Sequence, residues 1–339
     1  MKNLTTLGID LAKNVFQLHG TDERGKCVLT KRLTRGALAE FVATLPSCLI
    51  GIEACGSAHY WARRFKEMGH TVKIMSPQFV KPYIKSNKND KNDAAGIAEA
   101  VTRPGMRFVP IKTVEQQDIL LLHRTRELAI KQRTAQANQI RGLLAEYGVV
   151  IAKGKHHIKK LPEIIENNKE QLSEKAQAVF KQLHEHFRVI ETQVEYYEKQ
   201  IKQFTQTDAL CNELMELEGI GPITASAAVA TIGDAKAFKN GRSTAAWIGL
   251  TPKQHSSGNK ERLLGISKRG DSYLRKLLVH GARSVVRTCE SKTDKKSLWV
   301  ADKKKRCGQN KAAVALANKN ARIIWAIMAT GECYRKAVA

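Results

Sequence analysis

Four acidic residues near the start of the chain have the types and spacing of a site for phosphodiester chemistry. Asp10 and Glu53 each end a short apolar stretch that is typical of a strand, and Asp90 and Asp93 lie three apart where a helix is predicted to begin. Carboxylates repel one another, by about 1 kcal/mol for a pair about 4 Å apart in water and by about 4 kcal/mol at an effective dielectric constant of about 20. A cation is therefore expected between them.

The ligands of this cation would all be oxygens, which favours Mg²⁺, with Mn²⁺ as the alternative. Two such ions can activate an oxygen nucleophile and stabilise the leaving oxygen of a phosphodiester. A helix cap or a salt bridge is the structural alternative for each acid, and an N-cap is the strongest competitor for Asp93, which directly precedes AAGIAEA. Seven cysteines without a C-x-x-C pair predict neither a zinc site nor a disulfide framework.

The elements that would position these acids alternate between strand and helix patterns. Three strands in quick succession, 5–10, 14–19 and 26–33, predict an antiparallel meander. The pattern continues with a helix at 36–45, a strand at 48–53, a helix at 57–68, a strand at 71–75 and a helix at 93–103. Strand ends in such sheets converge on one rim, so the fold class predicted for this part is a mixed α/β sheet of the ribonuclease-H-like kind.

Two long helical patterns follow, at about 114–147 and 170–205, joined by KGKHHIKKLP, which is predicted to be a basic loop. They predict a helical hairpin with a narrow apolar stripe. Such a stripe is typical of packing against a second hairpin, so we expect a homo-oligomer, a dimer or a tetramer. A bundle within one chain is the alternative.

The last third of the chain is helical and strongly basic. Gly219, Gly221 and Pro222 lie between two helical patterns and resemble a helix-hairpin-helix, whose backbone N–H groups can bind a DNA phosphate, although a simple turn between helices has the same composition. Residues 251–311 contain 17 Lys or Arg and five acidic residues, and the whole chain carries a formal net charge of +25. Nucleic acid is the expected partner.

A membrane is not expected as the partner of this basic chain. No run approaches the roughly 18 apolar residues that a membrane-spanning helix needs, and the first ten residues, MKNLTTLGID, include an acid where a signal peptide would continue its apolar stretch. We therefore expect a cytoplasmic protein.

Several motifs in fixed order resemble the IS110-family transposases and, within them, the IS1111 subgroup. They are GIDLAKNVFQLHG, IGIEACGSAHYWAR, FVKPYIKSNKNDKNDAAGIAEA and WIGLTPKQHSSGNKERLLGISKRGDSYLRKLL. The resemblance implies a RuvC-like domain at 1–112, whose DEDD tetrad falls on the four acids above. It also implies a coiled-coil hairpin at 113–207 and a C-terminal transposase domain at 208–339 with a nucleophilic serine. That serine matches Ser257, the residue before Gly258, and not the adjacent Ser256.

The resemblance further implies that Ser257 attacks a DNA phosphodiester and forms a covalent protein–DNA intermediate, with the metal site assisting. Nearby basic residues would neutralise the phosphate or hold the strand: Lys260, Arg262, Lys268, Arg269 and Arg275. The resemblance also implies guidance by a structured non-coding RNA, the bridge RNA, which would pair with both donor and target DNA. The activator of Ser257 is not identified by the sequence.

Three other functions share part of these features. A RuvC-like junction resolvase would use the four acids to hydrolyse DNA and would not need Ser257. A site-specific DNA invertase of the pilin-inversion type shares the motifs and differs in its flanking DNA. A nucleic-acid-binding scaffold without activity would require the four acids to be structural.

Overall fold

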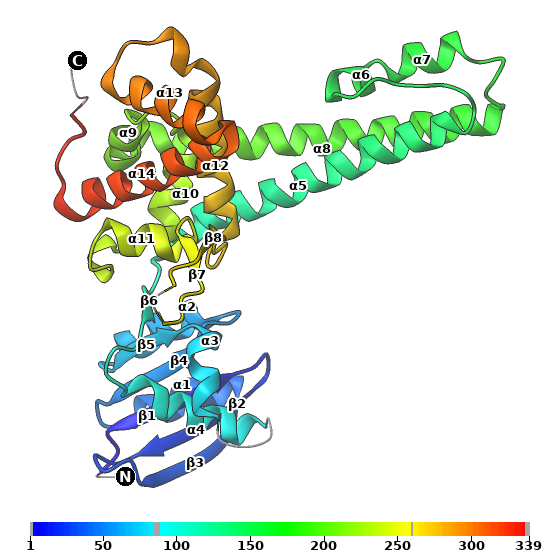
Figure 1. Cartoon of the computed structure of the whole chain (residues 1–339). Coiled ribbons are helices and arrows are strands. Elements are labelled where there is room, and N and C mark those ends of the chain that lie inside the picture. Colours follow the sequence, from blue (N-terminus) through cyan, green and yellow to red (C-terminus); the bar gives the residue numbers. More distant parts are fainter. Residues whose placement is uncertain (1–2, 85–88, 259, 336–339) are drawn as a thin grey trace. The chain divides into compact units, whose positions relative to one another are not determined.

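The chain folds into two compact units, Met1–Thr113 and Val114–Ala339. A computed structural model describes residues 3–84, 89–258 and 260–335. The first unit is built on a six-stranded sheet, and the second consists mainly of helices (Figure 1). This confirms the predicted fold class, a mixed sheet followed by a mainly helical region.

The sheet of the first unit has the strand order β3-β2-β1-β4-β5-β6. Its strands are β1 Thr6–Leu11, β2 Val15–Thr21, β3 Cys27–Thr34, β4 Leu49–Glu53, β5 Thr71–Met75 and β6 Phe108–Val109. The first three strands are antiparallel neighbours, as the meander prediction requires. Strands β1, β4 and β5 are parallel, and β6 returns antiparallel to β5. The central strands β1 and β4 therefore end at the same edge.

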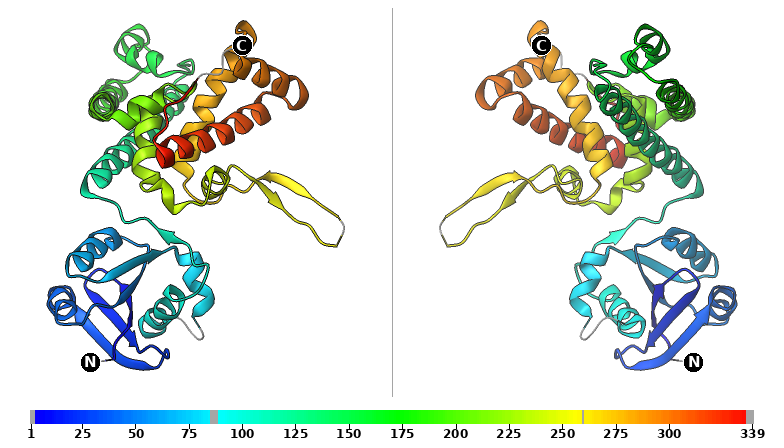
Figure 2. Two further views of the ribbon diagram at one scale, coloured as in Figure 1. Left: turned by 90° about the vertical axis from the view of Figure 1, so that its left-hand side faces the viewer. Right: turned by 90° about the vertical axis from the view of Figure 1, so that its right-hand side faces the viewer.

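Helices cover both faces of this sheet (Figure 2). On one face, α1 Arg35–Ala43 and α2 Ala58–Glu67 enclose a core that includes Ile9, Ile52 and Phe65. On the other face lie α3 Pro77–Val80, the short 3₁₀ helix Lys81–Tyr83 and α4 Asp90–Val101, with a smaller core that includes Met75 and Ile97. The residues of each strand alternate between these two cores, as the period of two in a β-strand demands.

Helix α4 lies unusually close to the sheet because two glycines face it. Gly8 on β1 and Gly51 on β4 are register partners. A Cβ atom on Gly8 would lie 2.3 Å from the carbonyl oxygen of Ala94, and one on Gly51 would lie 2.9 Å from Cβ of Val101. Neither position has room for a side chain, so these two residues set the distance between α4 and the strands.

The second unit begins with the helical hairpin, formed by α5 Val114–Ala145 and α8 Glu174–Thr207. The segment between them was predicted as a basic loop, which is wrong: it contains α6 Lys155–Lys159 and α7 Leu161–Asn167. These short helices form because Ile158, Leu161 and Ile165 are buried against the hairpin, in one core with residues of α5 and α8 such as Ile140 and Phe187. The hairpin thus has a core of its own at this end, and its pairing with a second copy stays a prediction.

The remaining elements of the second unit form a body rich in alanine and leucine. They are α9 Ala209–Met215, α10 Pro222–Ile232, the 3₁₀ helix Ala235–Ala237, α11 Gly241–Trp247, β7 Pro252–Gln254, β8 Leu263–Ile266, α12 Ser272–Thr288, the 3₁₀ helix Cys289–Ser291, α13 Lys295–Cys307 and α14 Gln309–Thr330. Helix α10 packs on both α5 and α8, so the helices on either side of residue 208 belong to one compact unit. None of the helices in the described ranges is both long and apolar enough to cross a membrane.

A buried carboxylate holds the short helix α6 against the hairpin. The side chain of Glu191 on α8 is only 7% exposed, and it forms ion pairs with Lys155 at 3.0 Å, Lys159 at 3.1 Å and Arg133 at 3.7 Å. Burial by itself would raise the pKa of Glu191, but the hydrogen bonds and charges of Lys155 and Lys159 outweigh burial and hold that pKa below its ordinary value. The charged form of Glu191 therefore stabilises the folded hairpin.

We predict that Glu191→Gln loosens α6 by about 1–2 kcal/mol at neutral pH, because the two lysines are half-exposed and partly screened. In the parent chain the contribution of Glu191 is complete above the ordinary carboxyl pKa of 4.5 and is lost as the pH falls through the lower folded value. Hydrogen exchange of the α6 amides measures both effects. The matched control is Glu185→Gln, which removes an exposed acid from the same helix; equal loosening in the control would contradict the role of Glu191.

Candidate active site and nucleic-acid interface

The parallel pairing of β1 and β4 brings Asp10 and Glu53 to one edge of the sheet. Ile9 is the register partner of Ile52, so the acids that follow these isoleucines are neighbours on adjacent strands. Both acids are half-buried. Each stands two residues after a glycine that faces α4, and the alternation of a strand therefore places both on the α4 face.

The negative charge at this edge affects the thiol of Cys55. Partial burial of the sulfur raises the pKa of Cys55, and the charges of Glu53 and then Asp10 raise it further. The sulfur lies 3.7 Å from the carbonyl oxygen of Leu11, at the end of β1. Both carboxylates thus act on one group, as expected if they share a site.

Helix α4 carries the other two acids in its first turn. Asn89 is the N-cap, because its side-chain oxygen accepts a hydrogen bond of 2.8 Å from the backbone N–H of Asn92. The helix therefore begins at Asp90 and not at Asp93, and the alternative in which Asp93 is the N-cap is wrong. Asp90 is exposed, whereas the Oδ1 atom of Asp93 is buried and has no hydrogen-bond partner among the described residues.

A buried carboxylate oxygen without a donor is costly unless a cation or a proton satisfies it. Asp93 lies four residues before Ile97 and eight before Val101, both of which contact Gly51, so Asp93 is on the face of α4 that packs on the sheet. Across the described part of the chain, no three His, Cys, Asp or Glu side chains are close enough together to hold a metal ion. The donor set and the orphaned oxygen fit a hard divalent cation, and the ligand assignments stay a proposal.

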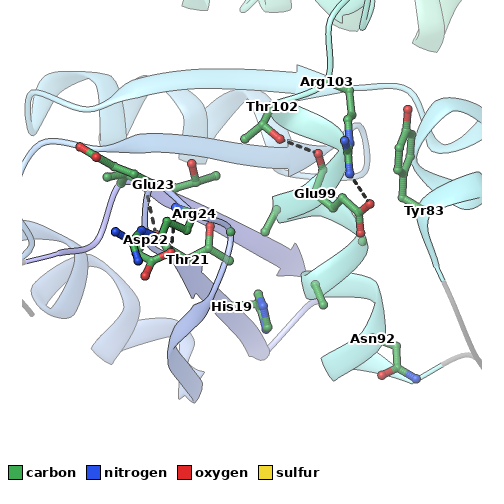
Figure 3. Close-up of a pocket in the computed structure, with 16 residues that line it drawn as sticks. His19, Thr21, Asp22, Glu23, Arg24, Tyr83, Asn92, Glu99, Thr102 and Arg103 are labelled. Atoms are coloured by element: carbon green, nitrogen blue, oxygen red, sulfur yellow. Dashed lines mark hydrogen bonds and ion pairs between the residues drawn. The ribbon is translucent and has the colours of Figure 1, made fainter.

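A separate polar cavity of about 660 Å³ lies between α4 and the turn that joins β2 to β3 (Figure 3). His19, Arg24 and Asn92 line it, and so does the ion pair between Glu99 and Arg103, whose atoms are 2.6 Å apart. None of the four predicted acids is among its lining residues. The acidic edge is therefore not part of this cavity.

Ser257 lies where the β7–β8 hairpin reverses direction. It forms an antiparallel bridge with Lys260, and Gly258 has the positive φ of 56° that a tight turn needs. The hairpin extends from the helical body of the second unit (Figure 2), and both of its strands are almost fully exposed. The hydroxyl of Ser256 accepts a hydrogen bond of 3.0 Å from the Gln254 side chain. The hydroxyl of Ser257 has no such partner among the residues described, and it is exposed.

The basic residues on and near this hairpin fall into two groups, which differ in exposure and in hydrogen bonding. The first group is exposed and consists of Lys260, Arg262, Lys268 and Arg269. Arg275 behaves differently, because its guanidinium donates to the carbonyl oxygens of Ile248 at 2.8 Å and Arg269 at 2.9 Å. Arg275 therefore holds the base of the hairpin in place, while the exposed group is available to a phosphate.

The predicted helix-hairpin-helix segment corresponds to α9, a turn and α10. Gly219 has a φ of +86°, and a Cβ atom there would lie 2.8 Å from the carbonyl oxygen of Gly281 on α12. Gly219 thus serves the close packing of this turn on α12. Gly221 is the N-cap of α10, is exposed and has open space around it. Of the two glycines, Gly221 is the one that a phosphate can approach.

A buried histidine joins the hairpin to α10 and α12. His123 on α5 is 1% exposed and lies 3.0 Å from Oγ of Ser226 and 2.9 Å from the hydroxyl of Tyr273. The Ser226 hydroxyl donates to the carbonyl oxygen of Pro222 at 2.7 Å, so it accepts from Nε2–H of His123. Nδ1 of His123 is then left to accept from Tyr273. Burial, and then the positive charge of Arg126, lowers the pKa of His123 to about 4.

Comparison with known proteins finds family matches in both units. The DEDD transposase domain of the IS110 type matches residues 7–149, and the transposase IS116/IS110/IS902 family matches residues 211–297. A probable family 20 transposase from Pseudomonas aeruginosa is 47% identical over 98% of this chain and 99% of its own length. The chain belongs to the IS110 family of transposases.

Two insertion-sequence transposases extend the comparison. The transposase for the element IS1111A of Coxiella burnetii is 47% identical to this transposase, over 99% of this chain and 92% of its own length. The transposase for IS1328 of Yersinia enterocolitica is 40% identical, over 99% of this chain and its own entire length. This chain is thus an insertion-sequence transposase, an enzyme that acts on DNA, similar over its whole length to that of IS1111A.

Three features of the transposase were missed at the level of sequence. The two glycines that contact α4 could have been recognised in the sequence, because Gly-Ile-Asp at 8–10 and Gly-Ile-Glu at 51–53 repeat one pattern before an acid. The N-cap Asn89 belongs to one of the two equivalent Asn-Asp pairs in KNDKND, so the sequence does not show which pair begins the helix. His123 has no local signal, since its partners are 103 and 150 residues away in the chain.

We predict that acid weakens the second unit through His123. Because its folded pKa of about 4 lies below the ordinary 6.5, the stabilisation is complete above pH 6.5 and is lost as the pH falls toward 4. His123→Gln should cost on the order of 1–3 kcal/mol at pH 7 and should flatten this dependence. Urea unfolding followed by tryptophan fluorescence measures both. The control is His280→Gln, an exposed histidine of α12; a parent chain with no loss of stability between pH 6.5 and pH 4 would rule the effect out.

Proposed function

We propose that this transposase breaks and rejoins DNA through a covalent bond to Ser257, assisted by a divalent cation at the acidic edge of the first unit. The observation that carries the proposal is the state of Ser257: its hydroxyl is exposed at a hairpin turn, beside exposed cations, and without a partner in the described chain. The neighbouring Ser256 is engaged by Gln254. Both serines are exposed, and Ser257 is favoured because its hydroxyl has no side-chain partner among the described residues.

The proposed reaction forms a bond between Oγ of Ser257 and a DNA phosphorus while the bond from that phosphorus to one bridging oxygen breaks. The serine gives up its proton, and the leaving DNA oxygen takes one up. Attack by another DNA hydroxyl reverses the step and releases Ser257, so no phosphodiester is lost to water. Lys260 and Arg262 lie beside Ser257 on the hairpin and would neutralise the charge that grows on the phosphate.

Asp10, Glu53, Asp90 and Asp93 are the residues that would hold the cation, preferably Mg²⁺ and alternatively Mn²⁺. Bound there, it would supply charge neutralisation and activation of oxygen at a phosphodiester. Support comes from the shared edge of Asp10 and Glu53 and from the orphaned oxygen of Asp93.

We also propose that a structured guide RNA selects donor and target DNA. The family resemblance of the motifs supports this, and so does a net charge of +25, which suits a protein that binds two kinds of nucleic acid together. Delegating sequence choice to base pairing would leave the protein with phosphate contacts. A homo-oligomer built through the α5–α8 hairpin belongs to the same proposal.

Ser257→Ala should abolish both strand transfer and any protein–DNA adduct that survives denaturation. Its affinity for DNA should not change, because one hydroxyl is negligible beside many phosphate contacts. Ser256→Ala is the matched control, and we expect it to retain the adduct. The measurement is denaturing electrophoresis of each protein after incubation with labelled donor and target DNA and the guide RNA.

Two outcomes would contradict this assignment. An adduct that persists in Ser257→Ala and disappears in Ser256→Ala would move the nucleophile by one residue. Cleavage by the parent protein with no adduct under any trapping condition would place the transposase with enzymes that hydrolyse DNA. A surface hydroxyl-to-hydrogen change alters stability by no more than about 0.5 kcal/mol, so unfolding would not explain lost activity.

Asp93→Asn should remove most of the stabilisation that Mg²⁺ gives to the first unit, because it removes charge from the orphaned oxygen. Thermal melting with increasing Mg²⁺ measures this: the parent should melt at a higher temperature, and the variant should respond much less. Glu40→Gln, which removes an exposed acid on α1, should respond like the parent. An equal Mg²⁺ response in Asp93→Asn and the parent would count against a site at this edge.

A further inference from the structure

A second basic surface of this transposase lies away from the Ser257 turn, along α14. It is a groove of about 970 Å³ between α14, the end of α13, the start of α11 and the base of the β7–β8 hairpin. Its cationic lining residues are Arg242, Lys303, Lys311, Lys319 and Arg322. We refer to it below as the α14 groove. Lys311, Ala315, Asn318 and Arg322 are spaced by four, three and four residues, so they form one face of the helix.

The charge of the α14 groove is not balanced within the protein. Its lining residues include no Asp or Glu, and none of its five cations forms an ion pair with a carboxylate of the described chain. Other basic residues of α13 do have such partners: Lys304 pairs with Glu290 at 3.0 Å and Arg306 with Asp302 at 2.9 Å. Cations gathered without counter-charges raise the local potential and favour a bound polyanion.

The α14 groove also contains an aromatic side chain placed among these cations. Trp299 of α13 is partly exposed, and its ring lies 4.6 Å from the Lys319 ammonium and 5.9 Å from that of Lys303. An aromatic ring beside positive charges suits an unpaired nucleotide, because the base stacks on the ring while the phosphate meets the ammonium groups. A base inside a duplex cannot reach such a ring.

The walls of the α14 groove are fixed by hydrogen bonds and close packing. The indole N–H of Trp325 donates to the carbonyl oxygen of Ala235 at 3.0 Å, and the side-chain amide of Asn318 donates to that of Leu250 at 3.2 Å. A Cβ atom on Gly241 would lie 2.9 Å from the carbonyl oxygen of Arg322, so α11 is seated directly on α14. The cations are thus presented by a rigid frame.

We infer that the α14 groove binds a single-stranded segment of nucleic acid, with an unpaired base on Trp299 and the backbone along Lys303, Lys319 and Arg322. The inference does not rest on the chemistry of Ser257. RNA and DNA share the features that the groove recognises, a phosphate backbone and a stacked base, so the experiment compares both.

The test measures binding of fluorescent oligonucleotides to the full chain carrying Ser257→Ala, in which the proposed reaction is absent. The probes are a single-stranded RNA and a single-stranded DNA of about twelve nucleotides, which is within the usual site size, and a DNA duplex of that length. The lining variant is Lys303→Gln/Lys319→Gln/Arg322→Gln. The matched control, Lys292→Gln/Lys295→Gln/Lys305→Gln, removes three exposed charges from α13 and the segment before it, outside the groove.

The lining variant should lower the slope of log affinity against log salt concentration by about 2 for single strands, since each lost phosphate contact contributes about 0.7. The control should leave the slope near that of the parent. Trp299→Ala should weaken single-strand binding about tenfold, and Trp299→Phe, which keeps an aromatic ring, should retain most of it. Preference for RNA or for DNA among the single strands would identify the source of the strand, and either supports the inference.

Three results would overturn it. Equal slope changes in the lining variant and the control would show a general charge effect. Equal losses in Trp299→Ala and Trp299→Phe would remove the stacked base. Equal effects on the duplex and on the single strands would make the groove a duplex-binding surface. Lys303→Arg/Lys319→Arg keeps the charge and should bind like the parent, which guards against a loss caused by misfolding.

Discussion

The arrangement of the first unit depends on the absence of side chains at Gly8 and Gly51. These paired glycines let α4 rest directly on the backbones of β1 and β4, with the Ala94 carbonyl where a side chain of residue 8 would be. Because α4 carries Asp93 just before Ala94, the depth of this contact sets how far that acid lies from the strand ends. A methyl group at either glycine would lift the helix and change the distances from Asp90 and Asp93 to Asp10 and Glu53. Packing and proposed chemistry are thus fixed by one contact.

Charge in the second unit falls into two classes with different physical roles. Some cations are paired internally and build structure, as Lys155 and Lys159 do on Glu191. Others, such as Lys319 and Arg322, have no carboxylate partner in the described chain and face open surface. Only the second class gains by neutralisation on a polyanion. The chain has 57 basic and 32 acidic residues. The positive potential that results from this excess is therefore strongest at the surfaces whose cations have no neighbouring carboxylate.

Five strands of the first unit could be predicted from sequence: β1, β4 and β5 are short apolar runs, and β2 and β3 follow β1 in quick succession. The two-residue strand β6 was not predicted. The start of α4 could not be predicted, since KNDKND offers two Asn-Asp pairs and local preference does not choose between them. Packing of Ala94 on Gly8 favours the earlier start. Helices α6 and α7 were not predicted for a similar reason. Their buried isoleucines lie in a lysine-rich segment, whose composition alone is typical of a solvated loop, and they are buried only by packing on the hairpin.

The candidate site divides in the same way. The acids at the strand ends could be predicted, because an acid directly after an apolar run is uncommon and indicates a function. The pairing of β1 with β4 brings Asp10 and Glu53 together. Ser257 carries no such signal, since HSSG is typical of any polar turn, and its assignment comes from resemblance to the family. The α14 groove was beyond sequence reasoning because Trp299 and Lys319 are brought together only by the packing of α13 on α14.

The exposure of the β7–β8 hairpin affects how firmly the protein itself can position Ser257. Its strands are exposed along almost their whole length, so little buried apolar surface holds the hairpin against the helical body. Arg275 fixes the base of the hairpin, and nothing comparable fixes the turn among the described residues. If Ser257 is the nucleophile, as proposed, contacts to bound nucleic acid would supply part of the free energy that holds its turn in place. On the proposed function, Ser257 would then be positioned for attack only once nucleic acid is bound beside it.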